Sequence, residues 1–469
     1  MNNSRYVTAL DIGSSKVAAI VGEKTAAGIK IIGYSEVPSD GVTRGEIIKI
    51  QKVAAAAGTA LGNVREQIQA VTDTDGYRIR KVYVNISGPN IRCVQGSIHR
   101  DRPDPLAAID KEEIGSMLEE MYGMKVEPSE QVLYVAPQYY DVDDHMGEPD
   151  PEYMDGKSID GEYKVFVGRS VSVARCKAVI DKLNLSAGNL ILTPMASGAA
   201  LLTDEERELG SVLVDIGAGT TDVVIYHGDI LRYAAVIPFG GNSVSEDISQ
   251  TCSISMRNAE QLKIQRGMCI SEFSKENTII IKEGGMTVKD VPAKLLSQAV
   301  EARVCEILAT VRHIIEVSGF KNKLHSRAVL TGGSANLNLI QLLAKNILGM
   351  DVRTGQPDSS IITGNSVEQV FRPQASTAVG LVIEAFRQQD SSEEEDSIPE
   401  ETWTGNTDDR TDSDGEPSLF TKEETGPVTQ PAKSHEQRER GDGSGKNKKV
   451  GIKNILQTLF PTTEEDGEA

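Results

Sequence analysis

Two segments far apart in the chain repeat one order of apolar and polar positions: an apolar run, an aspartate, a glycine-containing turn and a second apolar run. The first copy extends from Ala9 to Ala18 and the second from Leu213 to Val224. Two apolar runs separated by such a turn predict a β-hairpin. One copy alone would fit an ordinary tight turn, but two copies at a domain-sized spacing predict a duplicated α/β fold with one hairpin in each half.

Strand-like and helix-like patterns alternate through the rest of the chain, as is typical of α/β proteins. The longest helical pattern runs from Pro292 to Gly319 and places its apolar residues on one face, as expected of a helix that packs on a core. The segment from Val142 to Gly161 is polar and rich in turn residues, and it predicts an exposed loop. The other predicted elements are strands at 29–37, 81–86, 130–140 and 328–331, regular structure at 165–174, and helices at 49–61, 177–187 and 376–386.

These patterns and the changes in composition divide the chain into two lobes and three smaller parts. A more polar segment interrupts the first lobe and is predicted to be an inserted small α+β domain. A short helical pattern returns to close the first lobe after the second lobe is complete. The predicted boundaries are 1–86, 166–208 and 376–388 for the first lobe, 87–165 for the inserted domain, 209–375 for the second lobe with an outer subdomain at 246–326, 389–445 for a linker, and 446–462 for a terminal helix.

Composition narrows the class of protein. With 469 residues, of which 39% are hydrophobic, the chain can bury a large core in two or more domains. Its formal charge of −20 argues against nucleic-acid binding, which needs a basic surface. The five cysteines are scattered, as expected of reduced thiols in the cytosol. The sequence shows no signal peptide and no uncharged apolar run of about 18 residues, so we expect a cytoplasmic protein.

More than half of the net negative charge lies in residues 390–445, which contain 17 acidic and 5 basic residues. Apolar residues are sparse in this segment, and Ser, Thr, Gly and Pro are frequent. A segment of this composition buries too little surface to offset the entropy lost on folding, so we expect it to be disordered. The globular part of the chain is therefore only mildly acidic.

A basic and apolar segment follows the predicted linker. Its apolar residues recur at helical spacing and would share one face, with lysines before and beside them. We expect this helix to bind an anionic membrane surface through both kinds of residue, reversibly when it acts alone. Binding in a partner's groove and docking onto the globular body are the alternatives. The predicted membrane-binding residues are Lys448, Lys449, Ile452, Lys453, Ile455, Leu456, Leu459 and Phe460.

The two hairpin turns carry groups suited to binding phosphate. Glycine lets backbone N–H groups approach a phosphate closely, and neighbouring hydroxyl groups add donors. The aspartates at the strand ends, Asp11 and Asp215, would each hold a hydrated Mg²⁺ against the phosphates. A third turn, Gly332-Gly333-Ser334, could lie flat against a nucleoside, although a tight strand–helix joint explains that turn equally well by itself. The predicted phosphate-binding residues are Gly13, Ser14, Ser15 and Lys16 in the first hairpin, and Gly217, Gly219, Thr220 and Thr221 in the second.

The three turns resemble the phosphate and adenosine motifs of the actin-like ATPase superfamily. Within it, the chain resembles the FtsA family of bacterial cell-division proteins. This resemblance covers roughly residues 5–386 and rests on several motifs together, on the inserted segment, and on the short helix after an acidic linker. The further motifs are Gly33-Tyr34 with Pro38-Ser39, Leu201–Gly210, Ile237–Asn242, Ala259–Lys263 and Ser376–Leu381.

The resemblance implies a duplicated actin-like ATPase fold, with two lobes around a cleft that binds ATP and Mg²⁺. It implies self-association into filaments and a role in tethering the division protein FtsZ to anionic lipid on the cytoplasmic face of the inner membrane, at the division site. Later division proteins would bind through the inserted domain. By the same resemblance Gly241, Glu260 and Lys263 contact the nucleoside, although Glu260 and Lys263 also fit an ordinary pair on a helix surface.

A charged triplet on the long helix, Glu301, Arg303 and Glu306, resembles part of the surface that binds the FtsZ C-terminal tail in this family. A solvated polar face opposite the apolar stripe is the alternative interpretation. Two positions depart from the relatives. Ala218 replaces a frequent glycine, which predicts a tighter turn. Thr193 stands where heat-shock chaperones and MreB carry glutamate, so we expect at most slow ATP hydrolysis, with nucleotide as an assembly ligand.

Three other functions fit the same duplicated fold. A small-molecule kinase would need a catalytic aspartate in the cleft, which Asp215 could supply, but it has no use for the terminal helix. A heat-shock-type chaperone would need a folded peptide-binding domain after residue 386, where the sequence is acidic and poor in apolar residues. A pilus-assembly adaptor explains the body but leaves the terminal helix unexplained. We therefore expect a membrane-bound adaptor of cell division and no dedicated enzyme.

Overall fold

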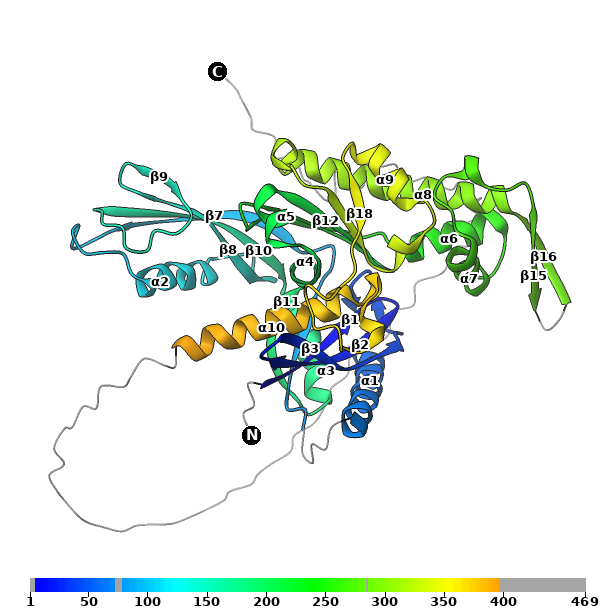
Figure 1. The fold of residues 1–469 in the computed structure, drawn as a ribbon, viewed down its shortest axis with the longest axis horizontal. Coiled ribbons are helices and arrows are strands. Elements are labelled where there is room, and N and C mark those ends of the chain that lie inside the picture. The colour runs from blue at the N-terminus through cyan, green and yellow to red at the C-terminus, as the bar shows by residue number, and fades with distance from the viewer. Residues whose placement is uncertain (1–4, 72–77, 284–285, 396–469) are drawn as a thin grey trace, which may run out of the picture. The chain divides into compact units, whose positions relative to one another are not determined.

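The fold is described from a computed structural model that covers residues 5–71, 78–283 and 286–395 (Figure 1). Residues 1–392 form one compact unit, which contains the fold and the site discussed below. The predicted terminal helix and nearly all of the predicted linker lie outside the described residues, so both stay predictions. No helix within the described residues is long and apolar enough to cross a membrane.

The first lobe is built on a mixed sheet. Its elements are β1 (Tyr6–Ile12), β2 (Lys16–Thr25), β3 (Gly28–Pro38), β4 (Val42–Thr43), β5 (Glu46–Ile47), α1 (Ile50–Val71), β6 (Lys81–Ile86), α3 (Ser170–Lys182), β11 (Ser186–Leu192), α4 (Thr193–Leu201), α5 (Asp204–Leu209) and α10 (Ser376–Glu395). The sheet order is β11-β6-β1-β2-β3. β1 to β3 form an antiparallel meander, and β6 and β11 continue the sheet in parallel on the other side of β1.

The second lobe repeats this topology. Its elements are β12 (Ser211–Ile216), β13 (Thr221–His227), β14 (Ile230–Ile237), α6 (Gly241–Cys252), α7 (Met256–Arg266), β15 (Thr278–Glu283), β16 (Met286–Pro292), α8 (Ala293–Val317), β17 (Ala328–Thr331), α9 (Ile340–Leu348) and β18 (Val352–Thr354). The order β14-β13-β12-β17-β18 again joins an antiparallel meander to parallel strands. The repeated hairpin pattern in the sequence therefore reflects a duplicated sheet topology.

The inserted domain is a sheet with one helix packed on it. Its elements are β7 (Arg92–Asp101), α2 (Lys111–Tyr122), β8 (Glu130–Val142), β9 (His145–Glu148) and β10 (Ser158–Arg169). The order is β7-β10-β8-β9, and its neighbours pair antiparallel. Apolar side chains of α2 and the strands form a separate core, which includes Met117, Tyr163 and Val165. This domain therefore has the hydrophobic core expected of a folding unit.

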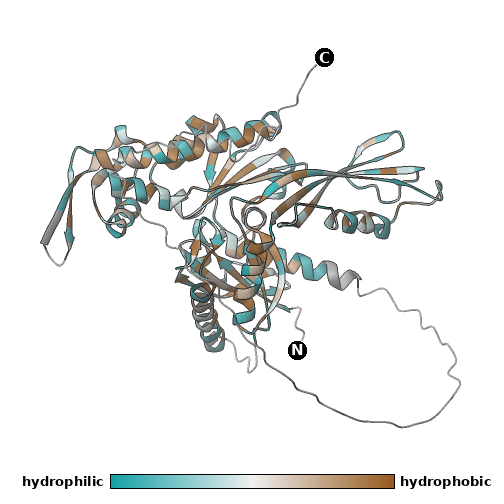
Figure 2. Cartoon of the chain, turned by 180° about the vertical axis from the view of Figure 1, so that it is seen from behind, coloured by the Kyte–Doolittle hydropathy of each residue, from teal (hydrophilic) through white to brown (hydrophobic). Residues whose placement is uncertain are grey.

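The closing helix α10 joins the largest core cluster of the protein. Its residues Val379, Val382 and Phe386 are buried with side chains from the sheets of both lobes. α10 crosses α4 so closely that a Cβ atom built on Gly380 would lie 1.7 Å from the carbonyl oxygen of Ala196. α8 buries one side, as its periodicity predicts, and Figure 2 shows apolar and polar residues on different sides of this helix. The lobes thus share a core beside the cleft.

The structure confirms the two hairpins and the long helix, but four sequence-based expectations differ. The segment Val142–Gly161 is not one exposed loop, because it holds β9 and the start of β10, with Ile159 buried. Backbone pairing of β10 to both neighbours makes these residues a strand despite their polar composition. The helix expected at 177–187 begins earlier, and residues 186–192 form a strand. The helices expected at 49–61 and 376–386 are both longer.

Candidate functional site

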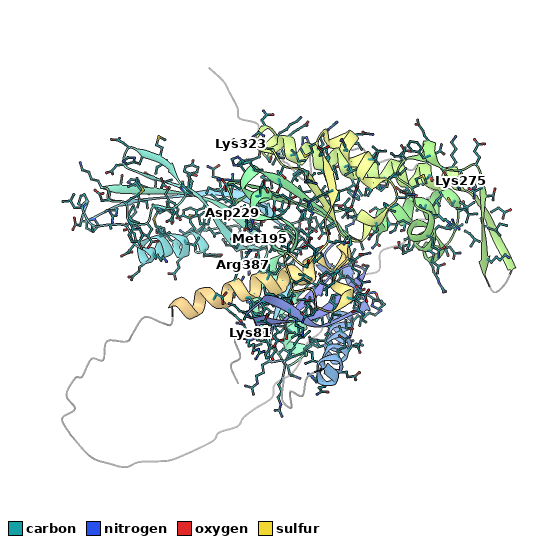
Figure 3. All side chains as sticks on the ribbon, in the orientation of Figure 1. Lys81, Met195, Asp229, Lys275, Lys323 and Arg387 are labelled. Carbon is teal, nitrogen blue, oxygen red and sulfur yellow. The ribbon has the colours of Figure 1, made fainter. Side chains whose placement is uncertain are left out.

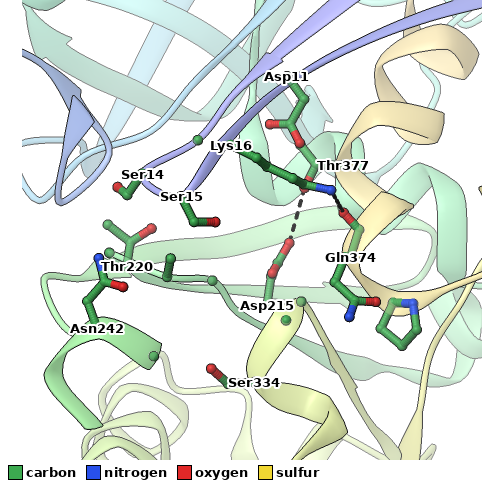
Figure 4. Close-up of a pocket in the computed structure, with 18 of the residues that line it drawn as sticks. Asp11, Ser14, Ser15, Lys16, Asp215, Thr220, Asn242, Ser334, Gln374 and Thr377 are labelled. Carbon is green, nitrogen blue, oxygen red and sulfur yellow. Dashed lines mark hydrogen bonds between the residues drawn. The ribbon is translucent and has the colours of Figure 1, made fainter. Parts of the chain in front are cut away.

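A cavity of about 600 Å³ lies between the lobes, within the size range of small-molecule sites. Both hairpin turns line it, together with Gly241 and Asn242 at the start of α6 and the Gly332–Gly333 turn after β17. In the view of Figure 4, Ser14 and Ser15 of the first hairpin lie just above Thr220 of the second, and Ser334 lies on the far side of the space. The duplicated topology therefore brings two equivalent turns to one cleft.

The tips of the two hairpins meet directly. A Cβ atom built on Gly219 would lie 2.3 Å from Oγ of Ser14 and 3.0 Å from the backbone N of Arg44. Ser14 Oγ also accepts a hydrogen bond of 3.1 Å from the backbone N–H of Gly45. Only a residue without a side chain fits this approach, so glycine at position 219 is required by the contact between lobes.

Three buried carboxyl groups line the cavity. Burial raises the pKa of Asp11 to about 6, and burial together with the charge of Asp215 raises the pKa of Asp222 to about 7. Burial also raises the pKa of Asp215, although Ser197 (2.7 Å) and Thr377 (3.2 Å) donate hydrogen bonds to its Oδ2 and oppose the shift. Their ionised forms are costly in this environment unless a positive charge compensates for them.

Lys16 brings positive charge to the same region. Its ammonium group donates to the carbonyl oxygen of Gln374 at 2.9 Å and to the hydroxyl of Tyr34 at 3.0 Å, and it forms an ion pair with Glu36. Burial lowers the pKa of Lys16, but Tyr34, Asp11 and Glu36 together outweigh that effect and raise it. Lys16 is therefore charged, and Figure 4 shows it between Asp11 and Gln374.

The opposite part of the cavity suits a nucleoside. Lys263 donates to the carbonyl oxygen of Gly241 at 2.8 Å and to Oε2 of Glu260 at 2.7 Å. Gly332 has a positive φ of 83°, and a Cβ atom there would lie 2.4 Å from Oδ1 of Asp215. Glu260 and Lys263, one helical turn apart on α7, line the cavity together with Gly332 and Gly333.

Two buried polar atoms beside the cavity have no hydrogen-bond partner among the described residues. They are Nε of Arg372 and Oε1 of Gln374, and both residues line the cavity. Buried polar groups are normally satisfied in folded proteins, by protein atoms or by ordered water. These two atoms are enclosed by the protein, so a ligand in the cavity would reach them only after the two side chains rearrange.

Mg²⁺ is the metal ion that the family resemblance implies for this cavity, with Asp11 and Asp215 as the residues that would hold it. Within the described part of the chain, no three Asp, Glu, His or Cys side chains lie close enough to ligate one ion. Asp11 and Asp215 instead present buried carboxylates beside a polar cavity, which suits an ion that keeps most of its water ligands, as Mg²⁺ does. The donor set thus fits hydrated Mg²⁺ held through water.

Nearly all of the sequence-predicted nucleotide residues line this cavity, and Thr221 is the exception. Its buried hydroxyl donates to the carbonyl oxygen of Phe239 at 2.9 Å, so it fixes the chain before α6. The cavity-lining residues are Asp11, Gly13, Ser14, Ser15, Lys16, Asp215, Gly217, Gly219, Thr220, Gly241, Glu260, Lys263, Gly332, Gly333 and Ser334.

Sequence reasoning missed several residues that the fold adds to the cavity. Asn85 donates to Oδ1 of Asp11 at 3.0 Å and accepts from the backbone N–H of Ile12 at 2.7 Å. Its position near the end of the predicted strand at 81–86 was the signal that could have identified it, because that strand pairs in parallel with β1 and ligand sites lie at such strand ends. Asp222 stood in the second hairpin motif itself. The sequence around Gln374 and Arg372 contains no motif that would indicate a role in binding.

The charged triplet on α8 lies outside the cavity and is already engaged within the second lobe. Arg303 forms a two-pronged ion pair with Asp247 of α6 at 2.6 and 3.1 Å and also pairs with Glu306. Glu301 accepts a 2.9 Å hydrogen bond from the backbone N–H of Ser271. These side chains are half-buried and ordered, and do not form the fully solvated face given as the alternative.

Comparison with known proteins places this geometry among cell-division proteins. Residues 212–380 match the family model described as Cell division protein FtsA, and residues 88–167 match the model described as the SHS2 domain inserted in FTSA. Cell division protein FtsA of Neisseria meningitidis is 32% identical over 390 residues, which cover 82% of this chain and 91% of that protein. Cell division protein FtsA of Escherichia coli is 29% identical over 388 residues, covering 81% and 90% respectively.

The fold is also similar to that of solved structures. A chain of the PilM-PilN type IV pilus biogenesis complex superposes with a TM-score of 0.58 at 18% identity, covering 81% of this chain and 98% of that one. At this level of identity the likeness concerns the fold alone.

Proposed function

The chain belongs to the FtsA family and has its duplicated actin-like ATPase fold with an inserted domain, and from this we propose that it binds ATP with Mg²⁺, assembles into filaments and tethers FtsZ to the membrane. It is a division-related actin-like protein. The observation that carries the proposal is one cavity of about 600 Å³ enclosed by both phosphate-type hairpins and the Gly332–Gly333 turn. Later division proteins would bind through the inserted domain.

The residues around the cavity support a nucleotide as the ligand. The hairpin turns offer backbone N–H groups and hydroxyls to phosphates, with Lys16 nearby. Asp11 and Asp215 would hold hydrated Mg²⁺, which would supply the positive charge that these buried carboxylates need. Glu260 and Lys263 would bind the ribose and base. When bound, the cation would neutralise part of the negative charge of the phosphates.

The family match favours this function over its alternatives. A relative at 32% identity over most of its length is a cell-division protein, whereas the pilus-assembly likeness is 18% identical and concerns the fold. The small-molecule kinase has no use for a basic, apolar terminal segment. That segment, with Lys448, Lys449 and Lys453 beside Ile452 and Leu456, supports the membrane part of the proposal from sequence alone.

Co-sedimentation with vesicles tests the tether. FtsZ from the same host is mixed with ATP, anionic vesicles and either the full chain or a version ending at Ser444. A variant with Lys448, Lys449 and Lys453 changed to glutamine keeps the apolar face and tests the charge. Uncharged vesicles are the lipid control.

Each outcome of this experiment decides one part of the proposal. FtsZ that pellets only with the full chain and anionic vesicles supports the tether, with the terminal helix as its anchor. A chain that binds lipid while FtsZ stays in solution would show that the client is another protein. If neither pellets, the terminal segment is no membrane anchor and the kinase class returns to consideration. Titration of ATP by calorimetry tests the cleft separately.

A further inference from the structure

We propose that Phe239 couples the cleft to the face of α8 that carries Arg303, so that nucleotide in the cleft tightens peptide binding on that face. This inference rests on the proposed function, because it takes the cleft as the nucleotide site and the Arg303 face as the site of the FtsZ tail. It adds a positioning role for Phe239 and Arg44, neither of which lines the cavity.

Two guanidinium groups from different lobes share the ring of Phe239. The Arg44 guanidinium carbon lies 5.8 Å from the ring centroid, and that of Arg303 lies 5.7 Å from it. Both distances are within the range of cation–π attraction. Arg44 comes from the turn between β4 and β5 of the first lobe, whereas Arg303 and Phe239 belong to the second. The Arg44 contact therefore exists only while the lobes are close together.

The backbone from Phe239 to Asn242 is hydrogen-bonded to the second hairpin. The hydroxyl of Thr221 donates to the carbonyl oxygen of Phe239 at 2.9 Å. The backbone N–H groups of Gly241 and Asn242 donate at 2.8 Å to the carbonyl oxygens of Gly217 and Ala218, respectively. A change in the conformation of the hairpin turn is thus transmitted to the segment that carries the ring.

Arg44 lies beside the contact between Ser14 of the first hairpin and Gly219 of the second. Its backbone N lies 3.0 Å from the position of a Cβ atom on Gly219, and the next residue, Gly45, donates to Ser14 Oγ. Arg44 therefore sits where the two hairpin tips meet. Phosphates held between these tips would draw the lobes together and keep the Arg44 guanidinium over the ring.

The Phe239 ring also contacts Arg303, which belongs to the proposed peptide-binding face (Glu301, Arg303 and Glu306 of α8). Arg303 is held by Phe239 and by its ion pair with Asp247, which lies on α6, the helix that begins directly after the Phe239 segment. Glu306, also in the proposed peptide-binding face, pairs with the same guanidinium. A fixed ring fixes this guanidinium, and a side chain already in its bound orientation loses less entropy when a peptide binds.

The size of the effect follows from the contacts involved. One cation–π contact at a partly exposed site changes an equilibrium by about two- to fivefold. We therefore expect saturating ATP and Mg²⁺ to lower the dissociation constant of the peptide by about that factor. Because coupling between sites is reciprocal, the peptide must tighten ATP binding equally.

Fluorescence anisotropy with the full chain and a labelled peptide of the host FtsZ C-terminal tail tests the coupling. The dissociation constant is measured without nucleotide and with saturating ATP and Mg²⁺ for the wild type, Phe239→Leu and Arg44→Gln. In both variants we expect the two constants to be equal. Phe320→Leu is the matched control, because it removes a ring 5.2 Å beneath Lys323, a residue that Figure 3 shows near one end of α8. It should keep the coupling of the wild type.

Hydrogen exchange separates failure of the coupling from failure of the peptide assignment. We expect ATP to slow amide exchange in residues 299–306 of the wild type and of Phe320→Leu, and to leave it unchanged there in Phe239→Leu and Arg44→Gln. An equal ATP effect in all four proteins would overturn the proposal. If the peptide fails to bind the wild type, the proposed peptide site is wrong, and exchange still decides whether Phe239 couples the cleft to α8.

Discussion

The hydroxyl of Ser87 donates a 2.8 Å hydrogen bond to Oδ1 of Asp222 across the cleft. Ser87 follows β6 at the point where the first lobe leads into the inserted domain, and Asp222 lies in β13 of the second lobe. Thr220 donates to the other oxygen of Asp222 at 3.1 Å. The root of the inserted domain is therefore bonded to the second phosphate-type hairpin.

The buried carboxyl of Asp222 predicts a pH-dependent stability of the nucleotide-free protein. Its pKa is about 7 in the folded state, against about 3.9 for an unfolded aspartate. Between these values the folded state binds more protons than the unfolded state, so its stability falls as pH rises from about 4 to about 7. Asp222→Asn removes this loss and should raise the free energy of unfolding at pH 8 by about 2 kcal/mol.

Urea unfolding of wild type and Asp222→Asn from pH 4.5 to 8 checks this expectation. The difference in stability between them should grow with pH and level off above about 7. Asp144→Asn, a change at an exposed aspartate of the inserted domain, is the control and should give a curve parallel to that of the wild type. A constant difference for Asp222→Asn would contradict the prediction.

Gly219→Ala should weaken nucleotide binding. Its methyl group would lie 2.3 Å from Ser14 Oγ and 3.0 Å from the backbone N of Arg44, so the hairpins must separate. Overpacking of this kind costs about 1–3 kcal/mol, which corresponds to a loss of about tenfold or more in ATP affinity. Calorimetric titration measures it. Gly62→Ala in α1, where a Cβ atom meets nothing within 4 Å, should leave ATP affinity unchanged.

Lys263→Met should distinguish the nucleoside end of the cleft from the phosphate end. The change keeps the apolar stem but removes the donor to Gly241 and Glu260, a buried ammonium group whose pKa burial lowers. Loss of a charged hydrogen bond to the nucleoside should weaken ATP by about tenfold or more and leave inorganic tripolyphosphate binding unchanged. Equal losses for both ligands would show that Lys263 does not contact the nucleoside.

ATP turnover should be slow. Thr193 donates to the carbonyl oxygen of Ile86 and accepts from Asn85, both at 3.2 Å, so its hydroxyl is engaged in the wall of the cavity. Without a carboxylate at this position to orient water, we expect about 10⁻³ s⁻¹ or less, the range of unassisted phosphoryl transfer in proteins. Phosphate release is measured below and above the concentration for filament assembly. Brisk turnover by the monomer would refute the assembly-ligand role.

Gly380→Ala should destabilise the whole fold. Its methyl group would collide with the carbonyl of Ala196, because α10 and α4 cross at backbone contact. Backbone cannot yield as a flexible side chain does, so we expect a loss of about 3 kcal/mol or more in the free energy of unfolding. Gly115→Ala in α2, where a Cβ atom has open space, should instead stabilise by about 0.5–1 kcal/mol. Thermal unfolding of both variants gives the comparison.

Local sequence patterns determined a large part of this molecule. The hairpins, the Gly332–Gly333 turn and α8 could be predicted because each depends on neighbouring residues: apolar periodicity, glycine conformational freedom and turn chemistry. The duplication also follows from sequence, since two copies of one local pattern require two copies of the element. The hairpins and this turn contain many of the cavity-lining residues, and they sufficed to predict phosphate chemistry.

The tertiary structure decided what depends on distant partners. Asn85 contacts Asp11 only because β6 pairs with β1, and Arg44 reaches Phe239 only because the lobes face each other. Residues 158–161, predicted as loop, form the start of β10 because both neighbouring strands satisfy their backbone hydrogen bonds. The raised pKa of Asp222 is likewise a property of burial. Sequence determined which chemical groups are available, and the packing of the lobes decided which of them meet and in what charge state, because burial and long-range contact arise only when the chain folds.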